Sequence, residues 1–360
     1  VRGDIPVTSI DAAYMIAPKT GYVKINKFGS NTYSEFLTSV VNLMADGAEK
    51  FVIDLRGNGG GFMEPAVLMA NEFLPAGSPI VSMRGKTAPD DRPTFSDGSG
   101  SLLNTELVVL IDEVSASASE IFAGAIQDND RGLVIGRRSF GKGLVQNQIE
   151  LPDSSALRLT IARYYTPSGR CIQKTYAPGT DYDRDIINRY EHGEFYSADS
   201  IKLDKSLAFE TMHGRTVYGG GGIMPDIFVP NDTAGITSYY LNVVNAGLIQ
   251  KYTFDYTDRN RDRLEKSGDV AALLRMLPDD DTLLQDFVSY SQKAGVAPRW
   301  YYINISRDLL VNQLKAMIVR NVLGVEGYFK VFNELDPTVV SGVEALASGK
   351  AAFPVKETRY

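Results

Sequence analysis

Two short segments in the first half of the sequence carry side chains that could perform nucleophilic catalysis. Residues 115–120, Ser-Ala-Ser-Ala-Ser-Glu, follow a strand-like run at 107–112 and precede a helix-like run at 121–126. A sharp strand-to-helix turn can hold a serine out of a sheet, at the positive end of the helix dipole. Residues 140–143, Phe-Gly-Lys-Gly, contain Lys142, and a lysine within reach could act as the base for that serine.

The middle serine, Ser117, also has a purely structural interpretation. Ser117 and Glu120 have the spacing of a capping box, in which the serine caps the helix and the glutamate reaches back to the backbone. Two features favour a catalytic role beyond capping. The small residues around Ser117 leave room for a substrate backbone. A glycine-rich turn at 58–61, which ends another strand, could also present free N–H groups to an oxyanion.

Lys142 lies in a segment that nearly spells a phosphate-binding P-loop. Residues 136–142 have the required spacing, but Gly143 stands where a Ser or Thr would hold magnesium. The run that follows is strand-like, whereas a P-loop leads into a helix, so the nucleotide interpretation fails on its context. The glycines on both sides of Lys142 indicate a backbone that passes close to other atoms, which is unusual for a solvated surface lysine.

Other titratable residues have simpler structural explanations. Asp54 and Arg56 flank the glycine-rich turn and could form an ion pair. Asp128 would stand about 16 Å from the candidate serine if one helix spans both, so we expect it to be a helix-end or scaffold residue. The two histidines, His192 and His213, lie in or near a polar segment, and we expect them at the surface. A serine enzyme of this sequence would therefore not use imidazole as its base.

Strand-like and helix-like runs alternate through the first 165 residues, which predicts an α/β layer with parallel strands. Each candidate segment follows or precedes one of these runs. The expected helices are 32–48, 65–73 and one that opens near Ser117; the expected strands are 21–27, 51–55, 79–83, 107–111, 133–135, 144–151 and 156–165.

The domain organisation follows from two changes in this rhythm. Residues 174–216 are polar and predict a surface excursion, and from residue 237 the pattern becomes helical. We therefore expect a linker or the end of an upstream region at 1–20, a core at 21–235 with the excursion inserted, and a helical accessory region at 236–360.

Composition excludes several classes of protein. The 360 residues carry a formal net charge of −7, which argues against a nucleic-acid partner. The single cysteine, Cys171, excludes an internal disulfide and a cysteine-rich metal site. No run approaches about eighteen apolar residues, so we expect no membrane span. The chain starts at Val1 without a signal peptide, and we expect any targeting segment to have been removed.

Five motifs in order resemble those of the C-terminal processing (tail-specific) serine proteases. The likeness covers residues 15–230 and leaves the helical tail outside. The motifs are Asp-Leu-Arg-Gly-Asn-Gly-Gly-Gly at 54–61, Ser-Ala-Ser-Ala-Ser-Glu at 115–120, Phe-Gly-Lys-Gly at 140–143, Ala-Arg-Tyr-Tyr-Thr-Pro-Ser-Gly-Arg at 162–170 and Gly-Gly-Gly-Gly-Ile-Met-Pro-Asp at 219–226.

The resemblance implies a Ser/Lys dyad that needs no metal or cofactor. Ser117 takes the nucleophile position, Lys142 takes the general-base position, and Gln146 matches a polar residue that helps orient the lysine. Lysine ordinarily has a pKa near 10.4, so a lysine base must lie where the ammonium form is disfavoured. An acyl-enzyme on the serine would then be resolved by water.

The resemblance also implies positions for the oxyanion hole and for a supporting acid. The backbone N–H of Ala118 and one from Gly59 or Gly60 would form the hole. The aspartate position of the family falls on Asp128, although the helix geometry above argues against direct contact with the serine.

For the whole chain, the resemblance implies a crotonase-like or ClpP-like α/β protease core with a C-terminal helical accessory region. The substrates would be proteins or peptides with exposed C-termini, and the location would be the bacterial cell envelope, in the periplasm. Such proteases usually carry an upstream PDZ domain that binds substrate C-termini by strand addition. None is found before residue 21, and a homo-oligomer is compatible with the sequence.

Two other classes of function stay open. The chain could be a non-catalytic module that holds peptide tails on a protease-like core. It could also be a cofactor-independent acyl-transfer enzyme that acts on small thioesters, although the sequence shows no sign of an acyl-carrier cleft. Acylation of Ser117 by a peptide substrate would separate the protease from the binding module.

Overall fold

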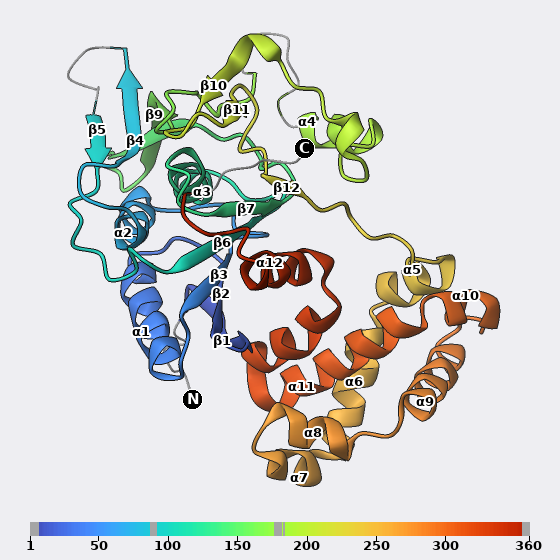
Figure 1. Ribbon diagram of the computed structural model, residues 1–360. Coiled ribbons are helices and arrows are strands. Elements are labelled where there is room, and N and C mark those ends of the chain that lie inside the picture. Colours follow the sequence, from blue (N-terminus) through green and yellow to red (C-terminus); the bar gives the residue numbers. More distant parts are fainter. Residues whose placement is uncertain (1–6, 87–91, 176–181, 183, 355–360) are drawn as a thin grey trace. The chain divides into compact units, whose positions relative to one another are not determined.

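The computed structural model describes residues 7–86, 92–175, 182 and 184–354. The chain divides into two compact units: unit 1 comprises Val1–Pro230 and Ser341–Tyr360, and unit 2 comprises Asn231–Val340. Unit 1 is mixed α/β and unit 2 is helical (Figure 1), so the predicted α/β class with a helical C-terminal region is confirmed. The division differs from the sequence-based one in that residues 341–360 group with unit 1.

The central sheet of unit 1 has the strand order β1-β2-β3-β6-β7-β12. β1 pairs with β2 in antiparallel fashion and the remaining pairs are parallel, as the alternating pattern predicts. β1 is not predicted from the sequence, because residues 10–17 have an irregular pattern of apolar and polar residues. This segment becomes a strand by pairing with β2. The strands are β1 (Ile10–Ala17), β2 (Thr20–Ile25), β3 (Lys50–Asp54), β6 (Glu106–Ile111), β7 (Leu133–Gly136) and β12 (Ile227–Phe228).

The central sheet is covered on both faces. Three helices, α1 (Thr32–Ala45), α2 (Met63–Phe73) and α3 (Ala118–Asp128), share one hydrophobic core with Leu107, Val109 and Ile111 of β6. The alternate residues of β6 face the other way, where Gly342 of α12 (Pro337–Ala347) lies against Val108 and Leu110. This double burial explains why β6 is an unbroken apolar run.

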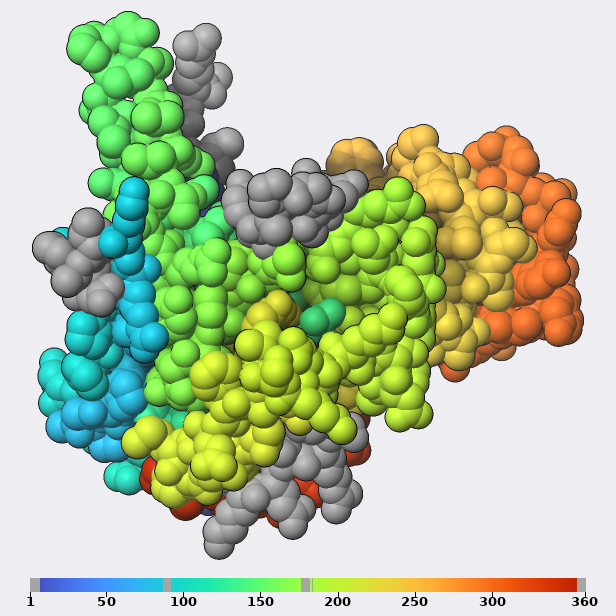
Figure 2. Space-filling view, turned by 90° about the horizontal axis from the view of Figure 1, so that it is seen from above, coloured from blue at the N-terminus to red at the C-terminus, as the bar shows by residue number. Residues whose placement is uncertain are grey.

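A second sheet is antiparallel, with the order β5-β4-β9-β8. Its strands are β4 (Pro79–Gly85), β5 (Arg92–Phe95), β8 (Leu144–Glu150) and β9 (Ala156–Tyr165). β8 forms one edge of this sheet, and the β8–β9 hairpin projects from unit 1 as the bright green arm in Figure 2. A small third sheet joins β10 (Ala208–Glu210) to β11 (Thr216–Tyr218).

The polar segment 174–216 is more structured than its composition suggests. It contains α4 (Asp185–Glu191), two short 3₁₀ helices (Ala198–Ser200 and Lys205–Leu207) and β10; residues 176–181 and 183 lie outside the described residues. Arg189 is buried and forms an ion pair with Glu194 at 2.8 Å. Arg189 also donates to the backbone carbonyls of Arg138 and Ser139. This segment therefore also braces the backbone that leads to Lys142.

Unit 2 has its own hydrophobic core, to which Tyr252, Phe287 and Leu314 contribute. Among the described residues, no helix is both long and apolar enough to cross a membrane. The helices that build unit 2 are α5 (Ser238–Asn245), α6 (Leu248–Arg259), α7 (Arg261–Leu264), α8 (Val270–Met276), α9 (Asp280–Lys293), α10 (Trp300–Ile305) and α11 (Arg307–Phe332), with the first residues of α12.

Candidate active site

Ser117 occupies the sharp turn between β6 and α3. Its backbone has φ 57° and ψ −113°, a positive-φ conformation that a side-chain-bearing residue rarely adopts. Strain of this kind is typical of functional turns that the surrounding structure holds in place. Ser117 and Glu120 also form the capping box that the sequence suggests, with the Ser117 N–H donating to Glu120 Oε2 at 2.8 Å. Capping and the strained turn therefore occur together at this serine.

The three serines of the Ser-Ala-Ser-Ala-Ser segment have different environments. Ser115 and Ser119 are fully buried, and their hydroxyls donate at 2.9 Å to the carbonyls of Leu55 and Asn58. Both bonds fasten the turn to the end of β3 and to the glycine-rich segment that follows it. Ser117, between them, lines a pocket. The outer serines position the turn, and the middle one is presented to the pocket.

The glycine-rich turn approaches Ser117 so closely that Gly60 cannot be replaced without rearrangement. A Cβ atom on Gly60 would lie 2.7 Å from Ser117 Cβ and 2.6 Å from the Ala116 carbonyl oxygen. The backbone of Gly60 also has a φ of 96°, which favours glycine. The Gly60 N–H donates to the Asn58 side chain at 2.9 Å. Ala118 is the first residue of α3, so its N–H has no acceptor within the helix.

Glu120 connects the serine turn to the lysine loop. Its Oε2 accepts from the backbone N–H groups of both Ser117 and Lys142, each at 2.8 Å. Its Oε1 accepts from the N–H of Gly141 at 2.7 Å and from the Ser139 hydroxyl at 2.5 Å. One buried carboxyl group therefore fixes the main chain at both candidate catalytic residues.

The electrostatics of Glu120 reflect two opposed effects. Complete burial raises the pKa of its carboxyl group above the usual value, and the four hydrogen bonds that it accepts oppose this rise. All three backbone partners can only donate. The arrangement therefore requires two accepting oxygens, which the carboxylate form supplies.

The glycines beside Lys142 allow the close backbone packing that the sequence suggests. A Cβ atom on Gly141 would lie 3.1 Å from the Gly222 nitrogen, and one on Gly143 would lie 2.9 Å from the Gln173 nitrogen. Gly222 belongs to the glycine-rich motif at 219–226, so the backbone of this motif packs directly against the lysine loop. The side chain of Lys142 lines the same pocket as Ser117.

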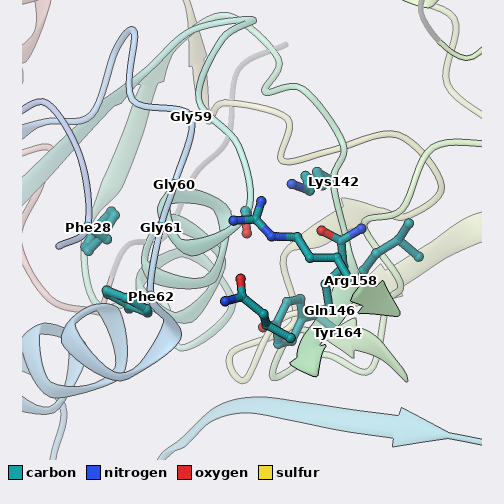
Figure 3. Close-up of a pocket in the computed structure, with 12 residues that line it drawn as sticks. Phe28, Gly59, Gly60, Gly61, Phe62, Lys142, Gln146, Arg158 and Tyr164 are labelled. Carbon is teal, nitrogen blue, oxygen red and sulfur yellow. The ribbon is translucent and has the colours of Figure 1, made fainter. Parts of the chain in front are cut away.

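This pocket has a volume of about 530 Å³ and brings together most of the predicted site (Figure 3). Gln146 enters it from the edge strand β8, and among the described residues no hydrogen bond joins Gln146 to Lys142. The predicted role of Gln146 in orienting the lysine therefore stays a prediction. The lining residues are Phe28, Gly59, Gly60, Gly61, Phe62, Ser117, Lys142, Leu144, Gln146, Gln148, Arg158 and Tyr164.

Asp128 lies at the opposite end of α3 from this pocket. It is buried and forms an ion pair with Arg170 at 2.7 Å, and it also accepts from the hydroxyl of Ser168. Its partners come from the Ala-Arg-Tyr-Tyr-Thr-Pro-Ser-Gly-Arg motif at 162–170, so this motif supports the far end of the helix. Asp128 is not among the residues that line the pocket.

The ion pair predicted between Asp54 and Arg56 is confirmed, with a shortest distance of 2.7 Å. Asp54 is fully buried and also accepts from Tyr22 and Lys24. Burial alone would raise its pKa, but the positive charges of Arg56 and Lys24 and the hydrogen bonds from Arg56 and Tyr22 hold the pKa below the usual range. This cluster anchors the chain just before the glycine-rich turn.

Neither histidine takes part in the pocket. The His192 ring contacts the Asn188 carbonyl at 2.6 Å, and the His213 ring contacts Asp130 at 3.0 Å. Among the described residues, no group of three or more His, Cys, Asp and Glu side chains could hold a metal ion.

Two features of the site were not anticipated from the sequence. The capping-box spacing pointed to Glu120, but only as a partner of Ser117 and not of the lysine loop. Arg158 on β9 lines the pocket as well. The regular alternation of β9 could have placed Arg158 on one face of a strand, but the sequence does not say that this face meets the serine turn.

Two family models match the sequence. Residues 19–186 match the model described as peptidase family S41, and residues 239–324 match one described as a family of unknown function. The first match contains the serine turn, the lysine loop and the β8–β9 hairpin. The second lies within unit 2.

Curated relatives include a carboxy-terminal-processing protease of Bartonella bacilliformis, 37% identical over 239 residues, which are 64% of this chain and 52% of that protein. A carboxyl-terminal-processing protease of Picosynechococcus is 36% identical over 156 residues, which are 43% of this chain and 37% of that protein. This chain thus spans about half or less of the length of these relatives. Among solved structures, the photosystem II D1 C-terminal processing protease is 38% identical, with a TM-score of 0.39, over 43% of this chain and 39% of that one.

Proposed function

We propose that this chain is a serine endopeptidase that cleaves unfolded or C-terminally exposed protein segments, because residues 19–186 match the model described as peptidase family S41. The observation that carries the proposal is the joint position of Ser117 and Lys142. Both line one pocket, and their backbone N–H groups bind the same oxygen of Glu120. The fixed main chain at both residues supports the proposed roles of Ser117 as nucleophile and Lys142 as base.

In the proposed reaction, Ser117 Oγ attacks the carbonyl carbon of a peptide bond. The neutral amine of Lys142 accepts the proton from Oγ during the attack and gives it to the leaving amine. The resulting ester on Ser117 is hydrolysed by water, with Lys142 again acting as the base. Gln146 is proposed to help orient the lysine once substrate fills the pocket.

The oxyanion that forms during the attack needs two hydrogen-bond donors. Ala118 is one proposed donor, because its N–H lies at the start of α3 and has no helical acceptor. Of the two glycines considered from the sequence, Gly60 already donates to Asn58. We therefore assign the second donor to Gly59, which lines the pocket, and assign Gly60 the task of allowing close approach.

Several wider properties belong to the same proposal. We propose that the core is of the crotonase-like or ClpP-like kind and that the helical residues 236–360 are an accessory region. The proposed location is the bacterial periplasm, and the proposed partners are protein tails that a PDZ domain elsewhere in the protein would recruit. Homo-oligomer formation is compatible with all of these statements.

The proposal is tested by degradation of casein, an unfolded protein, by the wild-type chain and by its Ser117→Ala and Lys142→Ala variants. Loss of cleavage in both variants is the expected result. Cleavage that survives in Ser117→Ala would show that another residue is the nucleophile. Binding of casein without cleavage by the wild type, even when the chain is extended upstream, would favour a peptide-tail binding module instead.

A further inference from the structure

Two basic side chains line the pocket, Lys142 and Arg158, and the guanidinium of Arg158 keeps its positive charge when Lys142 acts as a neutral base. None of the twelve residues lining the pocket is acidic. The chain as a whole has a net charge of −7, so this local excess of positive charge runs against the charge of the molecule. Such a pocket favours a negatively charged group on whatever binds in it.

Arg158 is built into the pocket by the register of the β8–β9 hairpin. It pairs with Gln148 across the two strands, and both side chains line the pocket. Figure 3 shows the guanidinium group of Arg158 pointing from β9 into the pocket, toward the glycine-rich turn. The side chain therefore lies beside the proposed reaction centre.

Among the described residues, no carboxylate forms an ion pair with Arg158. Glu150 is the acidic group on the same face of the hairpin, opposite Ala156, but no ion pair or hydrogen bond links it to Arg158. Asp153, at the hairpin turn, instead accepts from the backbone N–H and the hydroxyl of Ser155. The guanidinium donors of Arg158 are thus available to a ligand.

We propose that Arg158 determines specificity by binding a carboxylate group of the substrate. Guanidinium is planar and presents paired N–H donors that match the two oxygens of a carboxylate, and such bonds are shorter and stronger than neutral ones. The carboxylate belongs either to an acidic side chain near the cleaved bond or to the C-terminus of the substrate. This inference rests on the proposed protease function, which supplies the peptide substrate.

The test uses one synthetic peptide of casein sequence in matched forms. A glutamate near the cleaved bond is kept or replaced by glutamine, and the C-terminus is left free or amidated. The measured quantity is the ratio of kcat/KM between carboxylate and neutral forms. We expect the wild type to favour one carboxylate form by about tenfold to a hundredfold, and Arg158→Gln to abolish this preference.

Two further variants sharpen the test. Arg158→Lys keeps the charge without the paired donors, so it should retain only part of the preference. Arg163→Gln removes the same charge from the same strand outside the pocket, and its preference should equal that of the wild type. The glutamate and C-terminal forms show which of the two carboxylates is recognised.

Binding separates failure of this inference from failure of the proposed function. Peptide affinity is measured in the Ser117→Ala background, with and without the Arg158→Gln substitution, so that no cleavage is needed. Carboxylate forms should bind more tightly than neutral ones only when Arg158 is present, and the difference should shrink as salt is added. An equal preference for carboxylate forms in the chains with and without Arg158→Gln would overturn the assignment, whether or not the wild type cleaves the peptide.

Discussion

The two ends of α3 are both rich in polar residues, but they are bonded in different ways. At the far end, Asp128 and Arg170 are wholly buried and bonded to each other, and Gln127 bonds to both Arg170 and Asp226. At the near end, Ser117 and Lys142 face a pocket, and two of the four hydrogen bonds that Glu120 accepts come from their backbone N–H groups. A closed set of buried partners supports the fold. Polar groups left facing a cavity, on a fixed main chain, are available for chemistry.

The largest effect should come from removing the proposed nucleophile. Ser117→Ala should lower kcat by about 10⁴-fold or more, because no other group can form the acyl-enzyme. Ser119→Ala is the matched control, since it removes a hydroxyl of the same turn that donates to the Asn58 carbonyl. It should cost about 1 kcal/mol of stability and leave most of the activity. Equal activity loss in both variants, with both chains folded, would mean that the turn matters and not the hydroxyl of Ser117.

Lys142→Arg should be nearly as inactive as Lys142→Ala, because guanidinium does not give up its proton near neutral pH. The arginine variant places in the pocket a cation that cannot accept a proton, so it separates charge from proton transfer. The activities are compared by steady-state cleavage of one peptide by the wild type, Lys142→Arg and Lys142→Ala. Appreciable activity of Lys142→Arg would remove Lys142 from the role of base.

Glu120→Gln should lower kcat by about 10² to 10³-fold. Loss of one oxyanion-hole donor lowers kcat by a similar factor in other enzymes. The amide NH₂ of glutamine would replace one of two accepting oxygens, so two of the four donors would face another donor. Substrate affinity in the Ser117→Ala background should fall less than kcat, since Glu120 does not line the pocket. A large loss of affinity with unchanged kcat would contradict the positioning role.

Asp128→Asn should affect stability more than catalysis. It leaves the buried Arg170 without its ion-pair partner, and breaking such a pair typically costs about 3–5 kcal/mol. Denaturant unfolding of the wild type and the variant gives this cost. Activity of the folded variant should fall far less than that of Glu120→Gln. If Asp128→Asn lost activity as strongly while folded, the contrast between the two ends of α3 would fail.

The Asp54 cluster should give the smallest effect on activity and a defined dependence on pH. The pKa of Asp54 is lower in the folded chain than in the unfolded one, so its ion pairs stabilise the fold above the unfolded pKa of about 3.9. This stability is lost as the pH falls through the lower folded pKa. Asp54→Asn should therefore unfold more easily than the wild type at pH 7, and the difference should shrink in acid. A difference that is constant with pH would assign its cause to packing instead.

The parts of the site that can be predicted from sequence are those that depend on local patterns. Strand-to-helix alternation placed Ser117 correctly at the start of a helix, because the apolar run of β6 and the small residues after it are local signals. The position of β1 depends on pairing with β2, and the return of residues 341–347 to the sheet depends on packing with Val108 and Leu110. No local pattern encodes those contacts.

The missed site residues have the same physical origin. The sequence shows Glu120 next to the serine, but its bonds to Gly141 and Lys142 join segments that are 21 and 22 residues apart. Arg158 lies on a strand whose alternation fixes a face, while the meeting of that face with the glycine-rich turn follows from the packing of two sheets. Composition and spacing identify chemical groups, and tertiary structure decides which of them meet.

The most direct test of the central claim is the covalent state of Ser117 during turnover. Wild type, Ser117→Ala and Lys142→Ala chains are mixed with a peptide p-nitrophenyl ester, quenched in acid, digested and analysed by mass spectrometry. We predict the mass of the acyl group on the peptide containing Ser117 in the wild type, and its absence from both variants. An acyl group on another residue, or casein cleavage by Ser117→Ala, would contradict the account.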